Sequence, residues 1–323
     1  MTPRERAEIV LNLGVPDEVP TFELQFQLAE EFFGKSFENP DLTYENKLKM
    51  GEKAYMQAVY EHGIYTGQCM EKLDYCIMPV ATYTIPRYDE NDHLTEEAKL
   101  YYRAVREATN GQRMLIGILD HTFAIPDGQG MYEFAYRMAD EPESLLKEAQ
   151  KRVDQAIVRL EQLKLAGIDV IGMCSDYCFN NGPFISPSAF SEFIAPFLYQ
   201  QIKAAKEMGF YVIKHTDGNI MPIIDQIVQC GPHALHSLDP MAGVDIKVVK
   251  EMYGKQVALC GNVHCAAMQT GTDEEVIASA EYCMTHGKPG GGYFFCTSNI
   301  PFKGMPPHRY RMVLDIYNSM KKY

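Results

Sequence analysis

The sequence has few basic residues for its length and no run of them. Its 30 lysines and arginines face 43 aspartates and glutamates, which gives a formal net charge of −13. A protein that binds nucleic acid usually neutralises a row of phosphates with clustered Lys and Arg side chains. We therefore expect no nucleic-acid partner.

Long hydrophobic runs are also missing. The charged N-terminus is followed only by the short apolar stretch Ile9-Val10-Leu11, and a signal peptide or a membrane span needs a much longer one. Without a secretory signal, the nine cysteines are expected to be free thiols in a reducing compartment. The sequence thus predicts a cytoplasmic protein with no membrane partner. So many thiols, together with 18 methionines, favour an anaerobic host because both groups oxidise readily.

Several common cofactor and catalytic motifs are absent as well. There is no Gly-x-Ser-x-Gly elbow and no Gly-x-x-x-x-Gly-Lys loop, and the cysteines lack the two matched pairs of a zinc ribbon. The run Gly290-Gly291-Gly292 precedes a predicted strand, whereas a dinucleotide fingerprint follows one. No linker rich in Pro, Gly or Ser divides the chain. We expect one domain over residues 1–323, with an N-terminal helical extension.

What the sequence does contain, from about Asp140 onward, is a repeated order of helix, glycine and strand. A glycine that ends a helix can adopt the left-handed conformation that other residues avoid. The segments after these glycines are short and apolar, which is typical of parallel strands covered on both faces. The predicted strands are Val19–Glu23, Tyr75–Met78, Arg113–Leu119, Asp169–Cys174, Phe210–Lys214, Ala234–Leu238, Gln256–Cys260 and Gly292–Cys296. They predict a (β/α)8 TIM barrel of the α/β class, and an open doubly wound sheet is the structural alternative.

The helices of this repeat can be placed by their ends. We expect helices from Asp140 to Gly167, from Ser186 to Met208, from Asn219 to Gly231, up to Gly254, and from the capping box Thr272–Glu275 to Gly287. The polar region Thr82–Thr95 is expected to be a long loop over the mouth of the barrel.

Barrel enzymes carry their catalytic groups at the C-terminal ends of the strands. His215 and Asp217 leave one strand at alternate positions, so both side chains point to the same side, and both are competent zinc ligands. Cys296, at the end of the last strand, could supply a soft third ligand. The structural alternatives are that Asp217 caps the next helix, that His215 packs in the core, and that Cys296 is a small buried hydrophobe.

Other strand ends supply acid, base and binding groups. Asp176, His121 and Glu23 are candidate catalytic residues, although a turn cap or an ion pair would also account for a carboxylate at such a position. Tyr83, Tyr88, Tyr132 and Phe184 are candidates for an aromatic substrate pocket, and Asn262 is a further strand-end candidate for substrate binding.

Several of these segments resemble the uroporphyrinogen decarboxylase-like superfamily in order and spacing. The resemblance is carried by Ser175-Asp176-Tyr177, Gly182–Pro187, Lys214–Asn219, Asp239-Pro240, Leu259–Val263 and Gly290–Tyr293. It spans most of the C-terminal half and implies a (β/α)8 barrel with one of two activities. True uroporphyrinogen decarboxylases carry an arginine-rich N-terminal motif that this chain lacks. The other branch consists of corrinoid-dependent methyltransferases that bind zinc through His-x-Cys-Gly and a later Cys.

This chain departs from the zinc-binding pattern of that branch at two positions. The matching segment is His215-Thr216-Asp217-Gly218, with Asp in place of the first Cys, and Ser298 stands where the later Cys belongs, two residues after Cys296. With Asp in place of Cys, the metal ligands are harder and richer in oxygen, which implies that the substrate atom is not the thiol sulfur usual for that branch. The resemblance therefore implies a zinc-assisted O-demethylase component that moves a methyl group from an aryl methyl ether to the cobalamin of a partner corrinoid protein. A decarboxylase and a non-catalytic binding barrel are the alternatives. The sequence leaves open whether the chain acts alone or as a homodimer.

Overall fold

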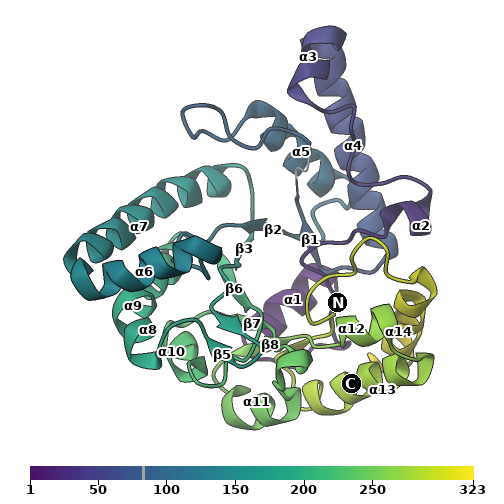
Figure 1. Ribbon diagram of the computed structural model, residues 1–323. Helices are drawn as coiled ribbons and strands as arrows, with labels where there is room; N and C mark the ends of the chain where they lie inside the picture. Colours follow the sequence, from purple (N-terminus) through teal and green to yellow (C-terminus); the bar gives the residue numbers. More distant parts are fainter. Residues whose placement is uncertain (82–83) are drawn as a thin grey trace.

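A curled parallel sheet forms the centre of the computed structural model, which describes residues 1–81 and 84–323 (Figure 1). The strands lie side by side in the order β1 (Ile77–Pro79), β2 (Met114–Ile118), β3 (Val170–Met173), β6 (Tyr211–Thr216), β7 (Ala234–Ser237), β8 (Ala258–Cys260) and β9 (Tyr293–Phe294). Thr21 forms parallel bridges to both Tyr75 and Phe295, next to the two outer strands, and so closes the sheet. The predicted (β/α)8 barrel is confirmed.

The first predicted strand, Val19–Glu23, is reduced to these bridges at Thr21. The backbone N–H of Val19 donates to Lys321 at 2.8 Å, and its carbonyl accepts from the Tyr317 hydroxyl at 2.9 Å. Pro20 has no N–H to give to a ladder. The backbone N–H and carbonyl of Val19 are therefore hydrogen-bonded to the C-terminal end of the chain and are not available to extend the strand. A strand that the sequence placed at Phe210–Lys214 instead runs on to Thr216, so His215 lies inside β6.

Helices surround the sheet. They are α1 (Pro3–Leu11), α2 (Ala29–Phe33), α3 (Tyr44–Met50), α4 (Glu52–Lys72), α5 (Glu96–Glu107), α6 (Gly128–Asp140), α7 (Pro142–Leu165), α8 (Pro187–Phe193), α9 (Ala195–Glu207), α10 (Ile224–Gln229), α11 (Ile246–Tyr253), α12 (Cys265–Thr270), α13 (Asp273–Gly287) and α14 (Pro307–Met320). A short 3-10 turn, η1 (Pro240–Ala242), follows β7, and a small hairpin, β4 (Cys178–Phe179) with β5 (Gly182–Pro183), follows β3. Figure 1 shows α3 and the start of α4 projecting away from the barrel. Within the described residues, no helix combines the length and hydrophobicity that crossing a membrane requires.

Two predicted helices differ from the observed ones for reasons of backbone chemistry. The segment Ser186–Met208 forms two helices that meet at Ile194, and Pro196 opens the second of them, where it cannot donate a helical hydrogen bond. The predicted helix from Asn219 shortens to α10, because Pro222 disfavours helical conformation in the residue before it. The capping box at Thr272 and helix α13 are confirmed.

Helix α1 closes one end of the barrel. Its residues Ala7, Val10 and Leu11 are buried in the same cluster as inward-facing residues of the strands. Arg4 pairs with Asp169 at 2.9 Å, just before β3 begins, so α1 lies at the N-terminal ends of the strands. The C-terminal ends remain for a functional site.

Candidate metal centre at the strand ends

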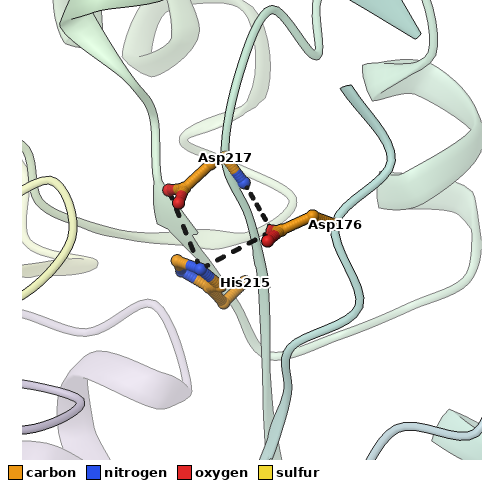
Figure 2. A group of neighbouring side chains, drawn as sticks. All are labelled: Asp176, His215 and Asp217. Atoms are coloured by element: carbon orange, nitrogen blue, oxygen red, sulfur yellow. Dashed lines mark hydrogen bonds and ion pairs between the residues drawn. The ribbon is translucent and has the colours of Figure 1, made fainter. Parts of the chain in front are cut away.

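Three polar side chains meet at the C-terminal ends of two neighbouring strands. His215 lies in β6, Asp217 follows it directly, and Asp176 follows β3. The His215 Nε2 atom is 3.8 Å from Asp176 Oδ1 and 3.7 Å from Asp217 Oδ1. Figure 2 shows both carboxylates turned toward the imidazole. The structure therefore brings together the predicted pair His215 and Asp217 and the predicted catalytic residue Asp176.

Both carboxylates are held in place by donors from other strand ends. Ser237 donates to Asp217 Oδ1 and Asn299 donates to Asp217 Oδ2, each at 2.6 Å. The backbone N–H of Asp217 donates to Asp176 Oδ1 at 3.0 Å. Asp217 is thus fixed from both sides, whereas the Asp176 side chain is 45% exposed and has more freedom.

A second histidine fixes the orientation of the first. His215 Nδ1 lies 2.8 Å from His236 Nδ1, so a single proton is shared between these two nitrogens. The two residues are partners in the register of β6 and β7. When His215 Nδ1 carries that proton, the Nε2 lone pair is available between the carboxylates. His236 then carries its own proton on Nε2, an atom that is buried without a hydrogen-bond partner among the described residues.

The electrostatics of the pair follow from its burial. Burial lowers the pKa of His215, although Asp217 and Asp176 oppose this effect. Burial likewise raises the pKa of Asp217, although His215 and the Ser237 hydrogen bond oppose it. Burial therefore favours the neutral form of both groups. A bound divalent cation would instead favour the ionised form of the Asp217 carboxylate.

A buried ion pair supports the loop that carries Asp176. Lys214 Nζ is 2.8 Å from Asp120 Oδ2, and both side chains are almost completely buried. Lys214 also donates to the carbonyl of Ser175 at 2.8 Å, while the Ser175 N–H donates to Asp120 at 3.0 Å. On the other side of Asp176, the N–H of Tyr177 donates to Thr216 at 2.9 Å. Both neighbours of Asp176 are therefore anchored to the barrel.

A cysteine precedes Asp176 closely in the chain but is not part of the metal group. Cys174 directly follows β3, two residues before Asp176. Burial raises the pKa of its thiol to about 12, with Lys214 opposing this effect and Asp120, Asp176 and Asp217 adding to it. All nine cysteines lie in the described part of the chain as free thiols, and Cys174 is partly exposed while the other eight are buried.

A pocket of about 610 Å³ opens beside Asp217. Its lining mixes polar, acidic and apolar side chains, and consists of Gln27, Asn180, Asp217, Asp239, Met241, Cys265, Ala266, Gln269, Ser298, Asn299, Ile300 and Phe302. No Lys or Arg from the described residues lines it. Such a pocket can take a small molecule whose reacting atom reaches Asp217.

Glu23 is buried elsewhere, in a network of its own. It accepts hydrogen bonds from the Thr297 hydroxyl at 2.6 Å and from the Tyr310 hydroxyl at 3.3 Å. Burial raises the pKa of Glu23 to about 8, although these hydrogen bonds oppose the shift. Burial therefore favours the protonated form of Glu23, which lies outside the group around His215.

Two further candidates do not join that group. Cys296 is buried in the barrel interior with Cys260, and burial raises its pKa well above the usual range. His121 Nε2 lies 3.1 Å from an Arg159 nitrogen, and burial lowers the pKa of this imidazole. The structure places neither of them beside His215.

The residues predicted to bind substrate are scattered. Tyr132 is exposed on α6, Tyr88 lies against Arg87 and Arg159, and Phe184 packs on Phe134. The Asn262 side chain donates to the backbone carbonyl of Leu238 at 2.6 Å, which gives it a structural role. Tyr83 lies outside the described residues.

Sequence reasoning missed three residues of the site: Ser237, Asn299 and His236. Ser237 and Asn299 had no distinguishing pattern, because each reaches Asp217 from another strand end. His236 had one available signal. It occupies the strand position that is in register with His215, but this pairing is visible only once the two strands are aligned.

The three ligand atoms are spaced closely enough to bind a divalent cation. In a tetrahedral zinc site with bonds of about 2.0–2.2 Å, neighbouring ligand atoms are roughly 3.4 Å apart. The three ligand atoms here lie within 4.8 Å of one another, and no described residue donates a hydrogen bond to His215 Nε2. Asp176, His215 and Asp217 therefore fit a cation such as zinc.

Comparison with known proteins gives a family and a fold. The family model described as uroporphyrinogen decarboxylase (URO-D) matches residues 94–319, more than two thirds of the chain. A methyltransferase from Methanosarcina mazei is similar in structure, with a TM-score of 0.70, 15% identity and 99% of each chain covered. At this identity the likeness shows a shared fold.

More distant structures include two other enzymes. A sugar phosphate isomerase/epimerase from Parabacteroides distasonis matches with a TM-score of 0.45 and 12% identity over 84% of this chain and 90% of that one. An α-galactosidase from Saccharomyces cerevisiae matches with a TM-score of 0.43 and 10% identity over 81% of this chain and 60% of that one. No curated protein matches the chain in sequence.

Proposed function

Because this chain belongs to the uroporphyrinogen decarboxylase family, we propose that it is a methyltransferase that takes a methyl group from a small methylated molecule, an aryl methyl ether, and passes it to the cob(I)alamin of a partner corrinoid protein. The observation that carries the proposal is the group Asp176, His215 and Asp217 at the mouth of the barrel. The structurally similar protein from Methanosarcina mazei is a methyltransferase, which supports the same reaction class.

A cation held by these three residues would act as a Lewis acid on the ether oxygen. The C–O bond breaks with its electron pair left on the oxygen, so negative charge develops there, and a positive site stabilises it. The corrinoid of the partner protein would supply the nucleophile and would accept the methyl carbon. The protein's own part is to orient the ligands. Ser237 and Asn299 fix Asp217, and His236 fixes His215.

The pocket beside Asp217 argues against decarboxylation of a multiply anionic substrate. Such a substrate needs basic side chains to hold its carboxylates. The pocket offers Asp217, Asp239 and several amides, and no Lys or Arg among its described lining residues. For the same reason we expect uncharged methoxylated aromatics to be better donors than those that carry a carboxylate.

The proposal is tested by mixing the protein with a corrinoid protein in the cob(I)alamin state and a panel of methoxylated aromatics. We expect the cob(I)alamin absorbance to fall as the donor is consumed and the corresponding phenol to appear. His215→Ala should lower the rate at least about 100-fold, because it removes a group that stabilises charge only in the transition state. His308→Ala is the matched control, since that imidazole is 60% exposed on α14.

Two outcomes would replace the proposal. Release of CO2 from a carboxylated compound, with no change in corrinoid absorbance, would make the chain a decarboxylase. Ligand binding that persists in His215→Ala, without turnover by the wild-type chain, would make it a binding barrel.

A further inference from the structure

The hairpin β4–β5 is fixed against the segment that carries Asp217. Asn219 donates its backbone N–H to the carbonyl of Phe179 at 2.9 Å. Gly218 makes this approach possible, since a Cβ atom at that position would lie 2.7 Å from the same carbonyl oxygen. The backbone of Gly218 is also in the left-handed region that favours glycine, with φ at 81°. The hairpin therefore keeps a fixed position beside the metal group.

The tip of this hairpin reaches the pocket beside Asp217. The tip consists of Asn180 and Asn181, which lie between the paired residues Phe179 and Gly182. Asn180 lines the pocket together with Asp217, whereas Asn181 is not among the described lining residues. The two neighbours therefore differ in whether they can contact a molecule in the pocket.

Turn chemistry does not account for an asparagine at position 180. Asparagine is common in turns because it tolerates the left-handed conformation and because its side chain can bond to nearby backbone groups. The backbone of Asn180 is not left-handed, and its side chain makes no hydrogen bond to a described residue. The amide is therefore free to bind a group inside the pocket.

Most other polar side chains of the pocket are already used by the protein itself. Asp217 is bound from both sides. Asp239 accepts hydrogen bonds from two backbone N–H groups at 2.9 and 3.3 Å, and Gln27 accepts one at 3.1 Å. The amides of Asn180 and Gln269 make no hydrogen bond to a described residue. Of these two, Asn180 has the shorter side chain and loses less conformational freedom when it binds a ligand.

We propose that Asn180 is a specificity-determining residue that binds an uncharged polar substituent of the methyl donor, such as a carboxamide or a hydroxyl group. This inference rests on the proposed function, in that it takes the methyl donor to occupy the pocket beside Asp217. A primary amide offers two N–H donors and a carbonyl acceptor, so it can match either kind of substituent. It carries no charge that would hold a carboxylate, and Asp217 and Asp239 in the same lining would repel one.

Three aromatics that differ in one substituent serve as probes: methoxybenzene, meta-methoxybenzamide and meta-methoxybenzoate. Titration followed by nuclear magnetic resonance, with the full chain supplied with Zn²⁺ and without a corrinoid protein, gives the dissociation constant of each. One net hydrogen bond between uncharged groups corresponds to about 2- to 10-fold in affinity. We expect wild type to bind the benzamide more tightly than methoxybenzene by this factor, and the benzoate more weakly than the benzamide.

Asn180→Ala should abolish the preference for the benzamide over methoxybenzene and leave the affinity for methoxybenzene unchanged. Asn181→Ala is the matched control, because it removes the same side chain from the same tip outside the pocket lining, and it should keep the wild-type preference. Both residues are exposed, so neither substitution removes a core contact. The inference is overturned if Asn180→Ala retains the preference, if both variants lose it equally, or if wild type binds the benzoate more tightly than the benzamide.

The corrinoid assay separates this inference from the proposed function. Methyl transfer to cob(I)alamin, together with an unchanged preference in Asn180→Ala, overturns the role of Asn180 alone. A preference that depends on Asn180, without methyl transfer from any donor, overturns the proposed function and with it the description of the ligand as a methyl donor. A wild-type chain that binds none of the three aromatics overturns the inference whatever the assay shows.

Discussion

At the scale of single residues, His236 contributes to the site through the hydrogen bond that it accepts from His215. Its ring lies in the apolar interior near Phe22, with ring centroids 5.9 Å apart, and its Nε2 atom has no partner among the described residues. An apolar side chain would fill this position without leaving a polar atom unpaired. We therefore attribute the presence of a histidine at position 236 to its hydrogen bond with His215.

Replacing His236 should weaken metal binding without unfolding the barrel. His236→Phe removes the acceptor for the His215 Nδ1–H, and loss of such an orienting partner typically costs about 10–100-fold in metal affinity. His236→Asn places an amide oxygen near the lost nitrogen and should recover much of the affinity. Competition with a chromophoric zinc chelator measures both. Equal zinc affinity in His236→Phe and wild type would contradict the orienting role.

Glu23 is expected to make stability depend on pH. Its pKa is about 8 in the folded chain against 4.5 for a free side chain, so the folded state keeps a proton that the unfolded state releases between these values. The free energy of unfolding should therefore fall as pH rises through this window, by at most about 1.4 kcal/mol per pH unit from this group.

The measurement for Glu23 is urea unfolding of wild type and Glu23→Gln from pH 5 to pH 8. The Gln side chain has no titratable proton, so the stability of the variant relative to wild type should increase with pH. Glu207→Gln, whose side chain is 68% exposed, is the control and should run parallel to wild type. A parallel pH dependence for Glu23→Gln would mean that Glu23 is ionised in the folded protein.

At the scale of elements, the end of β6 and the loop after β3 depend on one buried ion pair. Burial opposes ionisation of Asp120, but Lys214 and the Thr122 hydrogen bonds outweigh burial and lower its pKa. Because Lys214 and Asp120 also bind the two backbone polar groups of Ser175, the pair sets the position of Asp176.

Lys214→Met should therefore be strongly destabilising. It leaves a buried carboxylate without its partner, which costs about 3–5 kcal/mol in comparable cases. Lys203→Met breaks the exposed pair of Lys203 with Glu207 on α9 and should change stability by less than about 1 kcal/mol. Urea unfolding at pH 7 measures both. Similar losses in the two variants would show that the buried pair does not support the loop.

The elements also show what the sequence could predict. Helix α13 follows from its capping box, and the parallel strands follow from apolar runs after glycines. The break at Ile194 depends on Pro196, which is a local signal for it. The shortening of the first strand depends on the bonds of Val19, which donates to Lys321 and accepts from Tyr317. Bonds between segments far apart in the chain leave no local pattern, so the shortening of the first strand could not be predicted.

At the scale of the whole molecule, barrel closure decides which residues share a site. The sequence identified His215, Asp217 and Asp176 because each follows or ends a predicted strand, and closure brings such positions to one rim. The same rule also selected Cys296, His121 and Glu23, which lie elsewhere. All three lie at or just after the end of a predicted strand, but the direction of each side chain depends on register. That register is set by hydrogen bonds between strands and cannot be inferred from the sequence of any one segment.

The acidic character of the molecule agrees with the site. A net charge of −13 and a pocket that contains Asp217 and Asp239 both favour a cation at the mouth of the barrel. Helix α1 closes the opposite end, so the C-terminal rim is the face at which a substrate and a corrinoid protein would meet.

Metal content tests the central claim most directly. The wild-type chain, purified anaerobically, supplied with Zn²⁺ and freed of loosely bound ions by gel filtration, is analysed by mass spectrometry of its metals. We predict one zinc per chain in wild type and in His308→Ala, and none in His215→Ala. A folded wild-type chain that retains no stoichiometric metal would contradict a metal centre at Asp176, His215 and Asp217.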